Sequence, residues 1–350
     1  MKIAVAMSGG VDSSVTAALL KQQGHEVIGI TMHLFTPHAG GTGPAVHDAA
    51  VVARHLGIPH HVTDFTPDFS RLIIDDFVEE YRAGHTPNPC VRCNRYIKFG
   101  LLLDKARELG ADKLATGHYV RNTVDPDGTC HLRVACNVPK DQSYFLYSLT
   151  QQQLRQVIFP LGTVESKDEV RRLARDFSLP VAEKSDSQEV CFIPNDDYFS
   201  FLEECGSFGD TDGDIIHLNG QTVGRHHGTY RYTIGQRKGL GVAWKEPLYV
   251  TEIDVDRNIV FVGEQHHVFS DGLQAEEVNW IVAPEGDDFA AACKIRYRHR
   301  PVACRVYLVA RDNCVVRFDE PQKAITPGQA LVIYREDEVL GGGRIVRSRS

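Results

Sequence analysis

Hydrophobic and polar residues alternate between two patterns over the first two hundred positions. Short apolar runs predict buried strands, and longer stretches with helical spacing predict amphipathic helices. Ser166 and Glu169 form a capping-box pattern at the start of one such helix. Strands and helices in alternation predict a parallel sheet that is covered by helices on both faces. The predicted strands are KIAVAM, HEVIGITMHLF, HHVTDF and DKLATGHY, and the predicted helices span residues 12–23, 47–56, 68–81, 99–109 and 166–177.

The pattern changes after about residue 207. The helical period disappears, and short alternating runs are separated by Asp-Gly, Pro-Gly and Gly-Gly-Gly turn signals. We therefore expect three parts: an α/β domain at residues 1–207, a small β-rich central domain at 208–267, and a β-barrel at 268–350. The predicted strands of the last two parts are LYVTEIDV, NIVFVG, CKIRYRH, ACRVYLV, CVVRFD and ALVIYRE.

Composition narrows the class of protein only slightly. The 350 residues are 42% hydrophobic, enough for sizeable cores, and no apolar run approaches the length of a membrane span. The first residues lack a signal-peptide pattern, so we expect a cytoplasmic protein without a membrane partner. The formal charge of −8 argues weakly against a nucleic-acid partner, because local patches decide such binding. Nine cysteines without regular spacing do not form a disulfide framework.

The stretch AMSGGVDSS, residues 6–14, joins the first predicted strand to the first predicted helix. Gly9 and Gly10 let backbone N–H groups approach phosphate oxygens, and the helix directs its positive end at the anion. We expect the hydroxyls of Ser8, Ser13 and Ser14 to add donors. The familiar phosphate-loop lysine is missing, so no point charge is expected between the outer phosphates. Asp12 is instead placed to help hold a Mg²⁺ ion.

SGGxDS after the first strand is the signature of the PP-loop, or N-type, ATP pyrophosphatases, which this segment resembles. The resemblance implies a Rossmann-like domain that cleaves ATP to AMP and pyrophosphate. AMP becomes attached to a carbonyl oxygen, which a nitrogen or sulfur nucleophile then replaces.

TPNPCVRCNRYIKFG, residues 86–100, reads as a proline-stiffened loop that displays two cysteines. A structural zinc site would need a second ligand pair, and the chain has no other CxxC. Arg92, Arg95 and Lys98 would favour the thiolate of a reactive cysteine. Cys191, in KSDSQEVCFIPNDDY, is predicted to lie in a loop. Together with the PP-loop, Cys93 and Cys191 suggest sulfur transfer.

Six motifs in this order resemble the tRNA-specific 2-thiouridylases of the MnmA type. They are MSGGVDSS, TPNPCVRCNRYIKF, ATGHY, KDQSYFL, KSDSQEVCFIP and GTYRYTIGQRKGLG, and they extend over most of the chain. The resemblance implies an enzyme that binds ATP and tRNA, adenylates the C2 oxygen of uridine 34 and replaces that oxygen with sulfur. It also implies a PP-loop domain, a central domain and a barrel, and a cysteine desulfurase or sulfur-relay protein as the persulfide donor. We expect a monomer.

The resemblance also implies roles for individual residues. Cys93 would be the catalytic nucleophile, and Cys191 would carry the persulfide. An aspartate follows TPNP in the family pattern, whereas Cys90 stands there in this chain, so its part in the reaction is open. The implied ATP contacts are Ala6, Met7, Ser8, Gly9, Gly10, Val11, Asp12, Ser13, Met32 and Gly117. The implied contacts with the target base are Asn88, Pro89 and Cys90, and those with the rest of the tRNA are Lys140, Asp141, Gln142, Arg296 and Tyr297.

CKIRYRHR suggests how an acidic protein holds tRNA. In an extended strand Lys294, Arg296, Arg298 and Arg300 would share one basic face. Tyr297 would then point away, so a bulge or a strand end is needed if both Arg296 and Tyr297 contact RNA. A solvated strand face is the simpler interpretation of this row. Arg231, Arg237 and Lys238 on a glycine-rich loop are further candidates for backbone contacts.

Three alternatives share part of these features. An amide-forming PP-loop ligase would need neither Cys93 nor Cys191. A tRNA thiolase acting at another position should carry an additional RNA-binding module and a rhodanese-like sulfur carrier. A non-catalytic RNA-binding protein would have no use for a complete PP-loop. Whether the Cys191 persulfide attacks the tRNA directly or first releases sulfide stays open.

Overall fold

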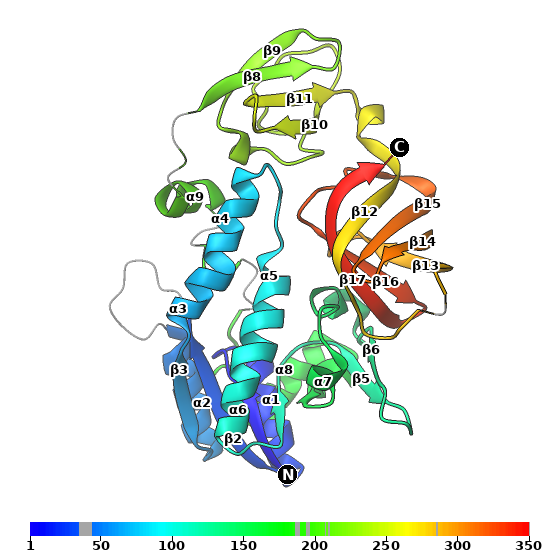
Figure 1. Ribbon diagram of the computed structural model, residues 1–350. Helices are drawn as coiled ribbons and strands as arrows, with labels where there is room; N and C mark the ends of the chain where they lie inside the picture. The colour runs from blue at the N-terminus through cyan, green and yellow to red at the C-terminus, as the bar shows by residue number, and fades with distance from the viewer. Residues whose placement is uncertain are drawn as a thin grey trace.

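The computed structural model describes residues 1–34, 44–185, 190–193, 197–206, 208, 211–284 and 286–349. Figure 1 shows three parts: an α/β part with the N-terminus at the bottom, a small β-sheet at the top, and a barrel on the right. The predicted boundary at residue 207 lies outside the described residues. No helix among the described residues is both long and apolar enough to cross a bilayer.

The α/β part is built on a parallel five-stranded sheet, as predicted. Its order is β3-β2-β1-β4-β7, and side chains of β1 alternate between two cores. Ile3 and Val5 pack with helices α1, α2 and α8, whereas Ala4 faces the core beneath the other helices. The strands are β1 (Lys2–Ala6), β2 (Glu26–His33), β3 (His60–Asp64), β4 (Lys113–Ala115) and β7 (Val157–Ile158). The helices of the first core are α1 (Val11–Gln22), α2 (Pro44–Leu56) and α8 (Lys167–Asp176).

Two long helices with π-helical interiors cover the other face of the sheet. Figure 1 shows the second of them, labelled α5 at one end and α6 at the other, as one continuous rod. The prediction of a loop around the CxxC motif is therefore wrong. Pro89 occupies a first-turn position, where its fixed φ favours helix initiation. The segments are α3 (Thr66–Phe69), η1 (Ser70–Ile74) and α4 (Asp75–Arg82), then α5 (Pro89–Arg92), η2 (Cys93–Leu101) and α6 (Leu102–Glu108).

The predicted helix at residues 166–177 is confirmed as α8, and its expected capping box is formed in part. The Ser166 hydroxyl accepts a hydrogen bond from the backbone N–H of Glu169 at 3.1 Å. The Glu169 carboxylate does not return to Ser166 but accepts from the backbone N–H of Glu165 at 3.2 Å. One half of the capping box is thus formed.

The central part is a four-stranded sheet of order β10-β11-β8-β9, in which β8 and β11 are parallel. Helix α9 (Tyr198–Gly206) precedes this sheet in the chain. The sheet has a small hydrophobic core of its own, which includes Ile215, Val250 and Val260. The prediction of a non-helical, β-rich segment is confirmed. The strands are β8 (Asp212–His217), β9 (Thr222–His227), β10 (Tyr249–Asp254) and β11 (Ile259–Gly263).

The C-terminal part is a six-stranded antiparallel barrel, closed by pairing of β12 with β17. The sequence pattern missed both closing strands. Residues 341–343, read as a turn, lie inside β17, and a Cβ on Gly341 would stand 2.2 Å from the Asn279 carbonyl oxygen. Glycine therefore permits a close strand approach here. The strands are β12 (Phe269–Trp280), β13 (Asp288–Lys294), β14 (Val302–Ala310), β15 (Asn313–Lys323), β16 (Ala330–Arg335) and β17 (Glu338–Arg349).

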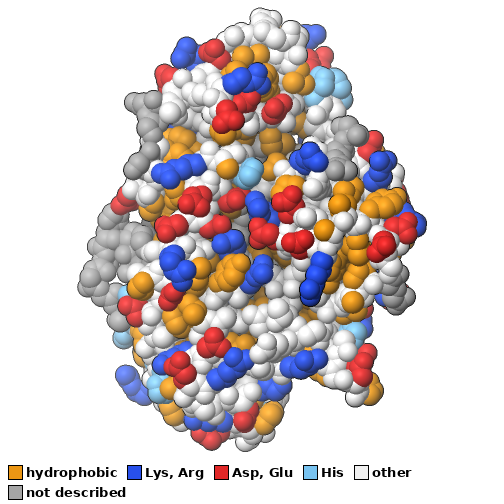
Figure 2. Space-filling view, in the orientation of Figure 1, with side chains coloured by type: hydrophobic (Ala, Val, Ile, Leu, Met, Phe, Trp, Pro, Cys, Tyr) orange, Lys and Arg blue, Asp and Glu red, His pale blue; other side chains and the backbone are white. Residues whose placement is uncertain are grey.

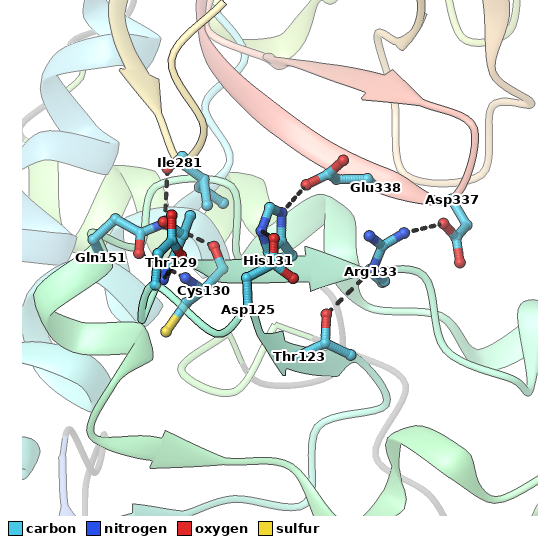
Figure 3. A network of polar contacts seen from close by, with 11 residues as sticks. Thr123, Asp125, Thr129, Cys130, His131, Arg133, Gln151, Ile281, Asp337 and Glu338 are labelled. Carbon is cyan, nitrogen blue, oxygen red and sulfur yellow. Dashed lines mark hydrogen bonds and ion pairs between the residues drawn. The ribbon is translucent and has the colours of Figure 1, made fainter.

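A hairpin from the α/β part, β5 (Arg121–Val124) and β6 (Cys130–Arg133), extends the barrel sheet through a pairing of β6 with β17. Figure 3 shows the polar contacts at this junction. His131 lies between Glu338 and Asp125, with 3.0 Å from its Nε2 to Asp125 Oδ2. The Arg133 guanidinium pairs with Asp337 at 2.8 Å. These contacts fix the barrel against the α/β part.

Gln151, in helix α7 (Gln151–Leu154), adds an uncharged link across the same junction. Its side-chain oxygen accepts from the Cys130 backbone N–H at 2.8 Å. Its side-chain nitrogen donates to the carbonyl oxygens of Cys130 at 2.7 Å and Ile281 at 2.9 Å (Figure 3). One amide thus uses both ends to connect the hairpin with the barrel.

Candidate active site

The predicted phosphate loop lies at the carboxyl end of the parallel sheet, between β1 and α1. Neighbouring strands β2 and β4 end at the same edge, which brings Met32 and Gly117 beside the loop. This edge is where open α/β sheets bind ligands. Met32 is half-buried, and an ideal Cβ on Gly117 would lie 2.9 Å from the backbone of Asp12 and Ser13. The structure therefore brings together the residues that the sequence associates with ATP.

The two loop glycines serve different purposes. Gly9 has φ +70°, and a Cβ there would lie 2.4 Å from the Ala45 carbonyl oxygen, so the fold itself requires glycine. Gly10 is the N-cap of α1 with φ −98° and ψ 167°, an extended backbone that any residue adopts. Its nearest obstacle to a Cβ is Ser8 Oγ at 3.4 Å, an ordinary contact. Packing thus gives no reason for glycine at position 10, whereas close approach of a ligand does.

The loop serines are less available than the sequence suggests. Ser14 is fully buried, and its hydroxyl donates to the Gly10 carbonyl oxygen at 2.8 Å. Ser13 is also buried, accepts from the Ser8 backbone N–H at 3.1 Å and donates to Gly10 at 3.2 Å. Only Ser8 is exposed. The Ser13 and Ser14 hydroxyls thus stabilise the turn in this structure, and their donation to phosphate stays a prediction.

Two lysines from distant parts of the chain lie at the phosphate loop. Lys167, at the start of α8, places its Nζ 2.7 and 2.9 Å from the two carboxylate oxygens of Asp12. Lys184 donates to the Gly9 carbonyl oxygen at 3.0 Å and to Asp48 at 2.6 Å. The loop itself has no lysine, but two lysines from elsewhere in the chain lie beside it. The cations come from positions that sequence spacing alone does not connect with the loop.

Asp12 is also bound by a tyrosine of the ATGHY motif. The Tyr119 hydroxyl donates to Asp12 Oδ1 at 2.7 Å. Carboxylate oxygens suit Mg²⁺, which protein sites of this kind hold through one or two carboxylates and substrate phosphates. The partly exposed Asp12 fits that requirement, although Mg²⁺ would have to replace contacts that Lys167 and Tyr119 now make.

Three thiols approach one another beyond the phosphate loop. Cys90 and Cys93 lie on the first turns of the long helix, and Cys191 comes from a separate segment; all three are free thiols. Cys93 is buried, and this burial raises its pKa to about 12, with a smaller opposing effect of Lys98 and raising effects of Cys191 and Cys90. Desolvation also raises the pKa of Cys90 and of Cys191, whose side chains reach solvent. The expectation that nearby cations favour the thiolate does not hold in this structure, because desolvation has the larger effect on the thiol pKa.

The segment that precedes the CxxC motif is held by all three parts of the protein. The Thr86 backbone N–H donates to the Pro327 carbonyl oxygen at 2.9 Å, and its hydroxyl lies 3.0 Å from that of Thr233 in the central part. Gln329 donates its side-chain N–H to the Thr86 carbonyl oxygen at 2.8 Å. Beyond this junction, Asn88 is half-buried, Pro89 is buried and Cys90 is exposed. Sequence reasoning missed this junction because its members are far apart in the chain.

Tyr297, one of the residues assigned to tRNA by resemblance, lies beside the segment that follows the KDQ motif. The ring of Tyr297 lies 4.5 Å from that of Phe145, which follows the KDQ motif by three residues. Strand β13 ends at Lys294, and Arg296, Arg298 and their neighbours form an irregular turn. The prediction of one extended basic face is therefore wrong. In this turn the exposed Arg296 donates to the Lys323 carbonyl oxygen at 2.7 Å, whereas the half-buried Tyr297 packs against Phe145.

The KDQ motif itself is largely committed to internal contacts. Asp141 is buried, accepts from the backbone N–H groups of Ala135 and Ser143, and lies 3.8 Å from Lys294 Nζ. The Gln142 side-chain oxygen accepts a hydrogen bond from the Tyr119 backbone N–H at 3.0 Å, and the Gln142 backbone N–H donates to the Tyr119 carbonyl oxygen at 2.9 Å. The motif thus positions both the ATGHY segment and the barrel loop.

Charge on the visible face is mixed. Figure 2 shows acidic and basic side chains interspersed, rather than one continuous basic surface. Several cations of the described residues are paired: Arg92 lies 2.9 Å from Asp76, and Arg344 lies 3.2 Å from Glu80 and 3.0 Å from Glu277. Burial raises the pKa of Asp76 to about 6, with Arg92 opposing this effect. The charges of Arg92 and Arg344 are therefore compensated within the protein.

Comparison with known proteins identifies relatives over nearly the whole chain. Three family profiles match: a tRNA methyl transferase HUP domain at residues 1–195, a tRNA methyl transferase PRC-barrel domain at 200–264, and an aminomethyltransferase beta-barrel domain at 270–345. The chain is 67% identical over 345 residues to a tRNA-specific 2-thiouridylase MnmA of Pelobacter propionicus, covering 99% of this chain and 97% of that one. It is 65% identical over 344 residues to the protein of the same name from Trichlorobacter lovleyi, covering 98% and 97%.

Similarity to solved structures is weaker. The U34-tRNA thiolase NcsA from Methanococcus maripaludis, solved with its [4Fe-4S] cluster, is 22% identical. The match covers 59% of this chain and 63% of that one with a TM-score of 0.37. A similarity of this size supports no inference about function.

Proposed function

The chain belongs to the tRNA-specific 2-thiouridylases, and on that premise we propose that it catalyses ATP-dependent 2-thiolation of uridine 34 in tRNA. It is a tRNA sulfurtransferase built on a PP-loop domain. The observation that carries the proposal is that the phosphate loop occurs in one chain with Cys93 and Cys191, and that Cys191 lies near enough to contribute to the raised pKa of Cys93.

In the first step ATP adenylates the C2 oxygen of the uridine and pyrophosphate leaves. The phosphates bind over the backbone of Gly9 and Gly10 at the positive end of α1. Lys167 and Lys184 supply the positive charge that the loop itself lacks. Asp12 takes part in binding the Mg²⁺ that accompanies ATP. The remaining ATP contacts are Ala6, Met7, Ser8, Val11, Ser13, Met32 and Gly117.

In the second step sulfur replaces the activated oxygen. The terminal sulfur of a Cys191 persulfide attacks C2, and the C–O bond to AMP breaks. The Cys93 thiolate then attacks the Cys191 sulfur of the resulting linkage. A Cys93–Cys191 disulfide forms, the electron pair of the broken S–S bond stays on the sulfur attached to C2, and a dithiol reductant later reopens the disulfide. If sulfide is released instead, Cys93 forms the same disulfide one step earlier.

The other two parts hold the tRNA. We assign residues 1–207 to adenylation and thiolation, 208–267 to a central connecting domain, and 268–350 to a tRNA-contacting barrel. The protein acts as a monomer in the cytoplasm and receives its sulfur from a cysteine desulfurase or relay protein. The target base lies against residues 88–90, and the remaining tRNA contacts are Lys140, Asp141, Gln142, Arg296 and Tyr297, with the Asp141 side chain acting from inside the protein.

Nucleoside mass spectrometry tests the proposal. A tRNA with uridine at position 34 is incubated with the protein, Mg-ATP and a persulfide-generating desulfurase, and a matched tRNA with cytidine 34 is the control. We expect 2-thiouridine only in the first tRNA, and none with Cys191→Ser although AMP still forms. AMP and pyrophosphate without any thionucleoside would contradict the thiolation step.

A further inference from the structure

The CxxC helix carries three cations near its two cysteines, and two of them are engaged elsewhere. The Arg92 guanidinium pairs with Asp76 at 2.9 Å and lies 5.2 Å from the centre of the Tyr96 ring. The Arg95 guanidinium lies 5.1 Å from the centre of the same ring. Neither arginine is among the charges that affect the pKa of Cys90, Cys93 or Cys191.

Lys98 differs from both arginines. It is half-buried, and its ammonium forms no ion pair, hydrogen bond or cation–π contact with any of the residues that the structure describes. An ammonium without an internal anion is available as a counter-charge for an anion that forms during function.

The π-helical geometry of η2 (Cys93–Leu101) directs Lys98 toward the cysteines. Hydrogen bonds in this segment connect residues five apart, as from the Leu102 N–H to the Ile97 carbonyl oxygen. Residues five apart are then neighbours on one face, as residues four apart are in an α-helix. Cys93 and Lys98 are five apart, and Cys90 lies one α-helical turn before Cys93. The widened helix thus aligns one lysine with the two cysteines.

The electrostatic effects agree with this alignment. Desolvation raises the pKa of Cys90, Cys93 and Cys191, and Lys98 is the cation that lowers the pKa of each of them. Lys98 also contributes to the depressed pKa of His118, after desolvation. The other titratable groups that affect these thiols are the thiols themselves: Cys90 and Cys191 for Cys93, and Cys90 for Cys191. Lys98 is therefore a shared counter-charge for thiols from two separate segments.

We propose that Lys98 is a positioning residue for sulfur transfer, whose ammonium stabilises the Cys191 and Cys93 thiolates as each of them forms. The inference rests on the proposed function. To load sulfur, the Cys191 thiolate attacks the outer sulfur of a donor persulfide, R–S–SH. A new S–S bond forms to Cys191, and the donor leaves as R–S⁻. Cys93 later needs its thiolate to attack the Cys191 sulfur. Lys98 donates no proton in either step and acts only through its charge.

The test compares Lys98→Met with Lys98→Arg and with Lys105→Met. Lys105 lies on the same long helix but pairs with Glu108 at 2.9 Å, so its variant is a matched control for loss of a lysine. The rate of iodoacetamide alkylation of Cys93 and Cys191 is measured against pH by peptide mass spectrometry, without ATP or tRNA. Thermal melting verifies that each variant is folded.

We expect Lys98→Met to move the alkylation profile of Cys191 about one pH unit upward, an approximately tenfold smaller thiolate fraction at neutral pH. Lys98→Arg and Lys105→Met should stay within about threefold of the unaltered protein. Thiolation by Lys98→Met should fall by about tenfold or more and recover partly at higher pH, with unchanged affinity for an ATP analogue.

Wild-type alkylation profiles for both cysteines in Lys98→Met would overturn the inference, whatever the thiolation rate. A shifted profile without any 2-thiouridine from the unaltered enzyme would contradict the proposed function, and would still support the effect of Lys98 on the thiols.

Discussion

Replacing Gly10 by alanine separates what the fold needs from what ATP needs. Gly10 has an extended backbone, with φ −98° and ψ 167°, and an added Cβ meets nothing closer than Ser8 Oγ at 3.4 Å. At the neighbouring Gly9, φ is +70° and the Cβ would stand 2.4 Å from the Ala45 carbonyl oxygen. The two substitutions add the same methyl group one residue apart, yet they should have opposite consequences.

The magnitudes follow from this geometry. In Gly10→Ala, the lower conformational entropy of the unfolded chain should stabilise the folded protein by about 0.4–1 kcal/mol. Alanine is a poorer N-cap than glycine, which offsets this gain, so the free energy of unfolding should change by less than about 1 kcal/mol. A methyl group over the backbone should remove a charge-assisted contact to phosphate, worth about 1.5–3 kcal/mol, and weaken ATP binding roughly 10–100-fold. For Gly9→Ala, left-handed strain and the clash together should cost about 2–5 kcal/mol of unfolding free energy.

Calorimetric titration with a non-cleavable ATP analogue measures the affinity, and chemical denaturation measures the stability. Gly24→Ala is a control for Gly9→Ala, because Gly24 has φ +83° with nothing within 4 Å of a Cβ and lies far from the loop. If Gly10→Ala bound the analogue as tightly as the unaltered protein, phosphate would not lie over this backbone. If Gly10→Ala lost several kcal/mol of stability, the steric reasoning would be wrong.

Three further predictions concern contacts described above. Lys167→Met should weaken binding of the same analogue about tenfold or more, and Lys167→Arg should restore much of it, because phosphate needs the charge; equal affinity of Lys167→Met and the unaltered protein would contradict this role. The pKa of His131 is raised above its ordinary value, chiefly by its hydrogen bond to Glu338. The protonated ring therefore stabilises the fold fully below about pH 6.5, and this stabilisation is lost as pH rises through the raised pKa. The Tm difference between the unaltered protein and His131→Gln should therefore shrink from about pH 5.5 to about pH 8.5, and a constant difference would argue against it. A double-mutant cycle of Thr86→Val and Thr233→Val should give a coupling free energy of about 0.5–1.5 kcal/mol in chemical denaturation, and zero coupling would mean that the hydroxyls do not interact.

Local patterns predicted the parallel sheet and the loop between its first strand and first helix because each depends on neighbours in sequence. The alternation of Ile3, Ala4 and Val5 between two cores is a property of any β-strand. Two local signals were misleading. Pro89 suggested a loop although proline is equally suited to a first helical turn, and the glycines at 341–343 suggested a turn although they permit close strand packing.

The parts of the site that the sequence could not predict depend on tertiary contacts. Lys167 is 155 residues from Asp12, and Lys184 is 175 residues from Gly9, so no motif spacing connects them. Desolvation is likewise a property of the folded chain. The arginines and the lysine near Cys93 suggested a lowered thiol pKa, but burial is the larger effect and raises it.

The central claim is that sulfur passes through Cys191 to an ATP-activated tRNA in one active site. Its most direct test is a single-turnover chase. Protein loaded by a desulfurase is digested under non-reducing conditions, and the Cys191 peptide is examined by mass spectrometry before and after addition of tRNA and Mg-ATP. We expect one extra sulfur atom on Cys191 after loading, and its loss only when both tRNA and Mg-ATP are present. The amount of 2-thiouridine formed should equal the amount of sulfur lost, and a Cys93–Cys191 disulfide should appear. Formation of 2-thiouridine while Cys191 never carries the extra sulfur would contradict the claim.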